Sequence, residues 1–293
     1  MHTFHRTPGE KLFDACNVLV LALLAFVTLY PFYNILITSF NDPIDAARGG
    51  VTFWPRIFSL ENYKLVFRDE SMLQAFFVTV ARTLAGTACA VLFTSAFAYG
   101  VSKPELLGRK LFLMMAIVTM YFHGGLIPEY LLIAKYLHLK GSFLVYILPT
   151  LFNVFNAIII LTFFRGIPKE MEESAKVDGA NDLIVFFRLA LPVSKPVLAT
   201  VALFNAVFHW NAWFDAMLYG GPELKTLQQI LMQIISSNSN VSLVASNLGI
   251  KTTVTAESVK LATMVITTLP IVFSYPFLQK YFVKGIMIGS VKG

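Results

Sequence analysis

Long stretches without any charged residue constrain this chain more than any other feature. Five runs contain no Asp, Glu, Lys or Arg: residues 15–41, 83–102, 141–164, 197–214 and 261–279. About 20 apolar residues cross the hydrocarbon core of a bilayer, so each run is long enough, or nearly so, to be a membrane helix. A sixth run, about 111–128, is charge-free but contains His123. The second run extends back to about residue 72 if Arg82 is admitted. We therefore predict an all-α integral membrane protein with six transmembrane helices, at approximately 15–40, 72–101, 111–128, 141–164, 197–218 and 261–279.

The composition agrees with a membrane protein and gives no sign of a second domain. The chain has 293 residues, of which 56% are hydrophobic and 14% charged, whereas soluble proteins have about 25% charged residues. We predict a single transmembrane domain over residues 1–293. The first apolar run is too long for a signal-peptide core and no small-x-small cleavage site follows it, so we expect it to be a retained span.

The placement of Lys and Arg predicts how the spans are oriented. Basic residues favour cytoplasmic loops, and short loops count most in this rule. With the N-terminus inside, both termini and the loop 166–195 are cytoplasmic, while the long loops 41–71 and 220–260 lie outside. Within the second outside loop we expect a helix over residues 227–235. The net charge of +6 then follows from membrane orientation. It requires no nucleic-acid partner.

Residues 166–195 form a charge-dense segment between two apolar spans. Acidic residues crowd the start of its first helix, where they favour the helix dipole. Gly179 is placed to end that helix in a left-handed conformation. Asn181 or Asp182 can cap a second helix, which we expect to end before Pro192. We interpret the segment as a rigid pair of helices at the membrane surface that receives a mechanical push from a soluble partner.

The same segment carries a family resemblance. Residues 173–180 read E-S-A-K-V-D-G-A and are followed by Leu191-Pro192, which resembles the EAA loop of permease subunits of ATP-binding-cassette (ABC) importers. Ser174 stands where that pattern has Ala, a small-for-small exchange. The resemblance implies that the segment docks on an ATPase subunit. The residues that it assigns to ATPase coupling are Glu170, Glu173, Ala175, Asp178, Gly179, Ala180, Leu191 and Pro192.

Three further stretches resemble the carbohydrate-uptake branch of that family: F-H-G-G-L-I-P at 122–128, W-N-A-W at 210–213, and residues 281–293. Within the branch they resemble a subgroup linked to uronate-containing oligosaccharides, such as alginate or pectin fragments. The implied fold is a type I ABC importer permease, with the EAA coupling helix on the cytoplasmic side. The implied location is the bacterial cytoplasmic (inner) membrane.

The resemblance also implies a set of partners. They are a second, homologous permease subunit forming a heterodimer, two ABC ATPase subunits, an extracytoplasmic solute-binding protein, the oligosaccharide and membrane lipid. The chain has no G-x-x-x-x-G-K-[ST] phosphate loop. We therefore expect no enzyme activity and no cofactor in this chain, with ATP and Mg bound by the partner ATPases.

Arg82 is the most unusual residue within a predicted span. It lies about ten residues, or roughly 15 Å, from the end of its span, so that its charge cannot easily reach the membrane surface. One hypothesis is that it lines the pathway of an acidic sugar. The alternative is a structural pair with helix-end carbonyls or with an acid on a neighbouring helix.

Amides and aromatic rings in two other spans are further candidates for the substrate pathway. Sugar recognition needs apolar ring faces and hydrogen-bonding amides, and His209, Asn211 and Trp213 supply such groups in the fifth span. Asn153 and Asn156 are similar candidates in the fourth span. The alternative for these residues is an aromatic belt with helix–helix hydrogen bonds. The five His residues show no metal-ligand spacing, so we predict no metal site.

Two alternatives to an acidic-sugar importer remain. The first is the same importer architecture acting on neutral oligosaccharides, with recognition carried largely by the partners. The second is a gradient-driven carrier. Carriers place carboxylates or broken helix pairs at the membrane midplane, and no Asp or Glu lies deep in any predicted span.

Overall fold

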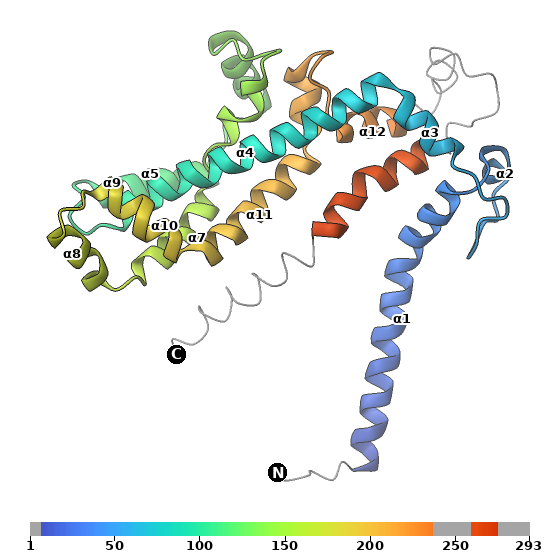
Figure 1. Ribbon diagram of the computed structural model, residues 1–293, viewed down its shortest axis with the longest axis horizontal. Coiled ribbons are helices and arrows are strands. Elements are labelled where there is room, and N and C mark those ends of the chain that lie inside the picture. The colour runs from blue at the N-terminus through green and yellow to red at the C-terminus, as the bar shows by residue number, and fades with distance from the viewer. Residues whose placement is uncertain (1–6, 237–258, 275–293) are drawn as a thin grey trace. The chain divides into compact units, whose positions relative to one another are not determined.

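The structure, a computed structural model, describes residues 7–236 and 259–274 (Figure 1). These residues are nearly all helical, and the one β pairing among them is an isolated bridge between Asn41 and Phe58. The predicted all-α fold is confirmed. The chain divides into two compact units, one from residues 1–69 and 234–268 and the other from residues 70–233 and 269–293.

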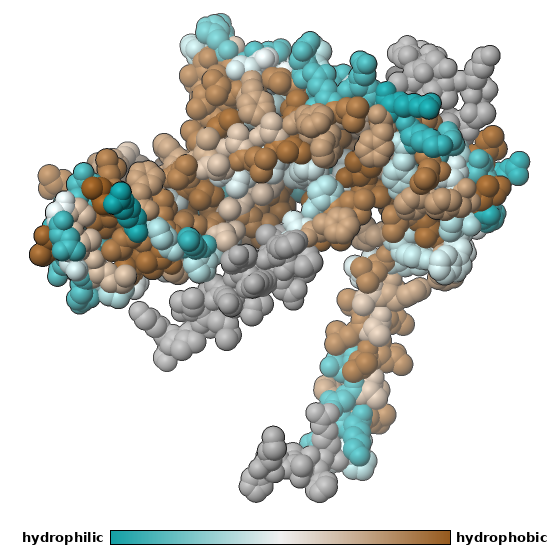
Figure 2. All heavy atoms as spheres, in the orientation of Figure 1, coloured by the Kyte–Doolittle hydropathy of each residue, from teal (hydrophilic) through white to brown (hydrophobic). Residues whose placement is uncertain are grey.

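The first unit begins with α1 (Pro8–Ser39), which contains the first predicted span. A capping box starts the helix: the Thr7 side chain accepts from the Glu10 backbone N–H, and the Glu10 carboxylate accepts from Thr7 N–H. The helix continues past Pro31. Its side chains are apolar over most of its length, with hydrophilic residues at the N-terminal end (Figure 2). A 32-residue apolar helix is long enough to cross a membrane.

Two short helices, α2 (Pro43–Ala47) and α3 (Glu61–Arg68), follow within the predicted outside loop 41–71. The fully buried Asn62 on α3 joins them to the end of α1, because its amide donates to the carbonyls of Ser39 and Asn41. Buried polar side chains that are hydrogen-bonded in this way hold a loop in one conformation. This loop is therefore folded.

The second unit is built around α4 (Glu70–Ser102), a 33-residue helix that covers the second predicted span. It packs against α7 (Val154–Arg165) and α11 (Lys195–Asn211). The other elements of this unit are α5 (Arg109–Tyr121), α6 (Leu126–Leu131), η1 (Leu132–Tyr136), η2 (Phe143–Tyr146), η3 (Leu148–Thr150), α8 (Lys169–Val177), α9 (Asp182–Val185), η4 (Phe186–Ala190), α10 (Leu191–Val193), η5 (Ala216–Gly220) and α12 (Leu227–Ser236). The helix predicted over 227–235 is confirmed.

Three pairs of apolar helices are each bent at a short break, and in two of the pairs the break falls inside a predicted span, the third or the fourth. The axes of α5 and the α6–η1 segment differ by 112°, those of the η2–η3 segment and α7 by 54°, and those of Asp182–Val193 and α11 by 83°. Two helices, α1 and α4, are long enough to cross a membrane unbroken, and up to five spans result if each bent pair is one span. A shorter apolar helix, Val259–Ser274, lies within the sixth predicted span, whose last residues are outside the described part of the chain. The count of six spans stays a prediction.

The sequence predicted that the second helix of the charged segment ends before Pro192, and the structure shows that it does not. It continues from α9 through the π-helical turn η4 into α10. In that turn the N–H of Leu191 donates to the carbonyl of Phe186, five residues back. A π turn shifts the hydrogen-bond ladder by one residue, and this shift lets the chain accommodate the missing N–H of Pro192 without ending the helix.

Candidate functional site

The charged segment has the helical ends that its sequence predicts. The helix α8 ends at Val177, and the turn that follows contains Gly179, which has a φ of +84°, in the left-handed region that favours glycine. The N–H groups of Gly179 and Ala180 donate to the carbonyls of Lys176 and Ala175 and close the turn. Asn181 then caps α9 by accepting a 2.9 Å hydrogen bond from the N–H of Ile184.

The two faces of this segment differ. Ala175, Ala180 and Leu191 pack against a buried cluster that also contains Tyr99 on α4 and Phe186. These three partly buried side chains attach the segment to the helices behind it. On the other face Glu170, Glu173, Asp178, Gly179 and Pro192 are exposed. Three exposed apolar side chains accompany them, namely Val177, Leu183 and Phe187, with 86%, 68% and 57% of their surfaces accessible. Exposed apolar residues among charges are typical of an interaction surface.

Two ion pairs hold α8 in place. Lys103, at the end of α4, pairs with Glu172 on α8, and its ammonium lies 4.0 Å from the centre of the Tyr99 ring. Lys176 pairs with Asp182 at 2.9 Å. The hydrogen bond from Lys176 lowers the pKa of Asp182 below its ordinary value, and the same bond raises the pKa of Lys176. The second pair is exposed to solvent and stabilises little, whereas the first is largely shielded from solvent and joins α8 to the longest helix of the unit.

A cavity of about 970 Å³ lies in the second unit, within the size range of small-molecule sites. Its wall comes mainly from α7, α11 and the segments next to them. Four of the candidate pathway residues line it: Asn153, Asn156, Asn211 and Trp213. The structure thus brings these residues together from two spans that are distant in the sequence.

Arg82 and His209 do not line this cavity; both side chains are fully buried beside it. Arg82 forms a two-pronged ion pair with Asp215, with Nη2–Oδ2 and Nη1–Oδ1 distances of 2.6 and 3.2 Å. Its Nη1 also donates to the Ala212 carbonyl at 3.4 Å, and its guanidinium lies 4.2 Å from the centre of the Tyr146 ring. The structure therefore contains the alternative predicted for Arg82, a structural pair with an acid and a helix-end carbonyl. A direct role of Arg82 in the pathway stays a prediction.

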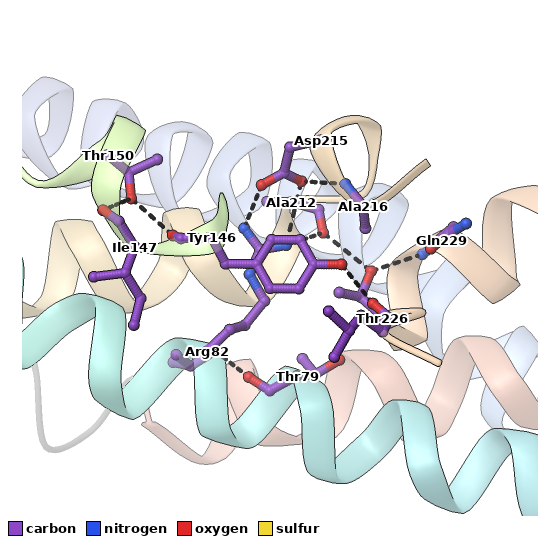
Figure 3. Close-up of polar contacts among 12 residues, drawn as sticks. Thr79, Arg82, Tyr146, Ile147, Thr150, Ala212, Asp215, Ala216, Thr226 and Gln229 are labelled. Carbon is purple, nitrogen blue, oxygen red and sulfur yellow. Dashed lines mark hydrogen bonds and ion pairs between the residues drawn. The ribbon is translucent and has the colours of Figure 1, made fainter. Parts of the chain in front are cut away.

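The Arg82–Asp215 pair belongs to a network that joins four elements (Figure 3). The Ala212 carbonyl accepts a second hydrogen bond, from the Thr226 hydroxyl at 3.3 Å. The backbone N–H of Leu227, at the start of α12, donates to Thr79 on α4 at 2.9 Å. The network fixes the chain just beyond α11, where Trp213 and Asp215 face the cavity.

His209 lies where α4 and α11 approach most closely. Its ring packs against Gly86, where any β-carbon would overlap the imidazole. Neither ring nitrogen has a hydrogen-bond partner among the described residues. His209 therefore packs against Gly86 in this arrangement, and its role in the substrate pathway stays a prediction.

Sequence reasoning missed most of the aromatic residues in the cavity wall. Phenylalanines from α7, α11 and the turn before α7 contribute to it, namely Phe152, Phe155, Phe204 and Phe208. Three of these precede an asparagine that also lines the cavity, in the pairs 152–153, 155–156 and 204–205. Repeated Phe-Asn pairs in two spans are a signal that could have identified the wall. Glu129 and Asp215 are its charged residues among those described. No group of three or more metal-ligating side chains occurs in the described part of the chain.

Comparison with known proteins places the chain in a family. No protein-family model matches it. Protein LplC of Bacillus subtilis (strain 168) is 41% identical over 293 residues, covering 100% of this chain and 99% of LplC. The polygalacturonan/rhamnogalacturonan transport system permease protein YtcP of the same organism is 38% identical over 285 residues, covering 97% of this chain and 99% of YtcP.

A solved structure agrees over nearly the same length. A chain in the crystal structure of a bacterial ABC transporter involved in the import of the acidic polysaccharide alginate has a TM-score of 0.88 and 30% identity, covering 96% of this chain and 100% of that chain. Together the fold and these relatives define a membrane transport subunit. The chain belongs to the permease subunits of ABC sugar importers. The family resemblance noted in the sequence is confirmed, and membership is consistent with a non-enzymatic transport subunit.

Proposed function

We propose that this chain is the transmembrane subunit of an ATP-driven importer that moves acidic, uronate-containing oligosaccharides across the bacterial cytoplasmic membrane by alternating access. The full-length similarity to a polygalacturonan/rhamnogalacturonan permease carries the proposal. The alginate transporter structure supports it, because alginate is also an acidic polysaccharide. In this proposal the 970 Å³ cavity forms part of the sugar pathway.

The proposal requires partner subunits. A second, homologous permease would complete the pathway, and two ATPase subunits would bind ATP and Mg. The exposed face of α8 and the following turn would dock on an ATPase, through Glu170, Glu173, Asp178 and the apolar side chains between the charges. An extracytoplasmic binding protein would deliver the sugar. With both termini cytoplasmic, the segment 166–195 lies on the side of the membrane where ATP is available.

A neutral oligosaccharide is the second candidate substrate. One observation favours it: no Lys or Arg is among the described residues that line the cavity. Uptake measurements with both kinds of sugar distinguish the two candidates.

The direct test is uptake by the reconstituted importer. The chain is co-expressed with its partner permease and ATPases, incorporated into lipid vesicles, and supplied with the binding protein and labelled trigalacturonate or its fully methyl-esterified, uncharged form. We expect ATP-dependent uptake of trigalacturonate. Uptake of uncharged sugars alone would overturn the acidic substrate, and uptake that continues without ATP would overturn the importer.

A variant of the turn after α8 tests coupling separately from assembly of the chain in the membrane. Gly179→Pro cannot adopt the observed φ of +84°, because proline holds φ near −65°. We expect it to abolish sugar-stimulated ATP hydrolysis and uptake while the chain still assembles in the membrane. Gly179→Ala is the milder control, since alanine reaches this conformation at a cost of about 1–2 kcal/mol. Normal uptake by Gly179→Pro would show that the segment does not couple.

A further inference from the structure

The charge of the cavity wall does not match an acidic sugar. Within the described residues, the wall contains two charged side chains, Glu129 and Asp215, and both are carboxylates. A uronate that enters this space meets no cation on this wall. Burying an unpaired carboxylate is unfavourable, and a second carboxylate nearby makes it more so.

The nearest guanidinium cannot provide the missing charge. Arg82 is fully buried, and its two terminal nitrogens already bind Asp215 and the Ala212 carbonyl. Asp215 therefore stands between Arg82 and the cavity that it lines. The pair is neutral as a whole. What remains uncompensated on the wall is Glu129.

The uncharged part of the wall offers hydrogen-bonding groups that are not fully used within the chain. The Asn205 and Asn211 amide nitrogens donate to the carbonyls one turn back, at 2.9 Å each. An amide has two donors and two acceptor positions, so the Oδ1 atoms of these two residues retain their accepting capacity. The Asn153 Oδ1 accepts from the N–H of Asn156 at 3.0 Å, which leaves the Asn153 Nδ2 group to donate. Donors and acceptors of this kind match sugar hydroxyls, which both donate and accept.

The same wall presents flat apolar surfaces beside these amides. Phe155 and Phe208 are 54% and 53% exposed, and Trp213 also lines the cavity. An aromatic face covers an apolar surface well, and one face of a pyranose ring is made of C–H groups. Both α7 and α11 contribute phenylalanines and asparagines to the wall, so apolar ring surfaces and amides are available on the same side of the cavity.

We infer that this wall recognises the hydroxyls and ring faces that neutral and acidic saccharides share, and that it does not bind the uronate carboxylates. The carboxylates are held by groups outside this wall, and Glu129 disfavours a carboxylate beside it. The inference rests on the proposed function, because it takes the cavity to be part of the sugar pathway.

The test compares two sugars that differ only at their carboxyl groups, which are charged in one and esterified and uncharged in the other. Trigalacturonate and its methyl ester have the same rings and hydroxyls, and their kcat/KM for uptake is measured in the reconstituted importer. We expect Asn156→Leu and Asn211→Leu each to lower kcat/KM about five- to tenfold, the effect of one lost hydrogen bond. The factor should be the same for both sugars. A loss confined to the free acid would overturn the inference, because it would show that these amides read the carboxylate.

Thr162→Val is the matched control. Thr162 lies on α7 outside the cavity lining, and its hydroxyl donates to the carbonyl of Ile158 on its own helix. Its uptake of both sugars should equal that of the unmodified importer. Basal ATP hydrolysis by all variants checks that the complex is assembled.

Glu129→Gln tests the repulsive part of the inference. Removing this charge should raise kcat/KM for the free acid about threefold and leave the ester unchanged, as expected for one partly screened charge. No gain for the free acid would overturn the role given to Glu129.

If the unmodified importer takes up the ester alone, the acidic substrate of the proposed function fails. The role of the wall is then tested with the ester alone. Unchanged ester uptake in both asparagine variants would overturn the inference that the wall recognises hydroxyls and ring faces.

Discussion

At the scale of single residues, two buried polar side chains determine how the second unit packs around its cavity. Arg82 is compensated by Asp215, while His209 fills the space left by the missing side chain of Gly86. Sequence alone identified Arg82 as a residue that needs a partner, because a charge within a span must be paired. It could not identify Asp215, which is 133 residues away and is brought close by the turn after α11.

Arg82→Gln should destabilise the chain and reduce uptake of acidic and neutral sugars by the same factor. Breaking a buried ion pair from one side costs about 3–5 kcal/mol, and we expect about 3 kcal/mol because 26% of the Asp215 side chain is exposed. The measurement is the thermal unfolding midpoint of the purified complex, together with uptake. The double variant Arg82→Gln/Asp215→Asn removes the unpaired charge and should recover part of the stability. A double variant no more stable than Arg82→Gln would show that the pair contributes nothing.

Gly86→Ala should lower the unfolding midpoint, because the added methyl group has no room beside the His209 ring. Overpacking of this kind costs about 1–3 kcal/mol. Gly100→Ala on the same helix is the control, since a β-carbon there meets nothing within 4 Å. Alanine favours a helix over glycine by about 1 kcal/mol, so Gly100→Ala should be neutral or stabilising. Equal midpoints for the two variants would contradict the close approach of α4 and α11.

At the scale of elements, the sequence predicted local features such as caps and turns well, and it did not predict where helices break. The left-handed Gly179, the cap at Asn181 and the helix α12 follow from short-range rules, and the structure contains all three. The break before α7 and the end of α11 at Asn211 fall inside charge-free runs. Apolar composition shows that a run can cross a membrane, but it does not show where the helix within it stops. The helix continues through Pro192 because of a π turn, and no residue pattern predicted that turn.

The ion pair between Lys103 and Glu172 should contribute to coupling, because it ties α8 to the end of α4, and α4 also carries Arg82 beside the cavity. Lys103→Glu places two like charges together and should lower the number of sugars taken up per ATP hydrolysed. The exchange variant Lys103→Glu/Glu172→Lys restores opposite charges and should recover much of that ratio. The ratio is measured in vesicles from uptake and phosphate release. If the exchange variant is as poorly coupled as Lys103→Glu, the pair does not link the two helices in the way described.

At the scale of the whole molecule, the second unit combines a surface suited to a soluble partner with a cavity suited to a sugar. The charged segment, residues 166–195, packs on the buried cluster to which α4, α7 and α11 contribute. The same helices α7 and α11 provide most of the cavity wall. A displacement of α8 therefore acts on helices that shape the cavity, which is what alternating access driven from the cytoplasm requires.

The most direct test of this account is to identify what accompanies the chain in the membrane. The complex is purified from its native host in a gentle detergent after light crosslinking, and its components are identified by mass spectrometry. The account predicts an ATPase and a second, homologous permease, with crosslinks from the ATPase to residues 169–192. A chain recovered alone or as a homodimer, with no ATPase even after crosslinking, would contradict it.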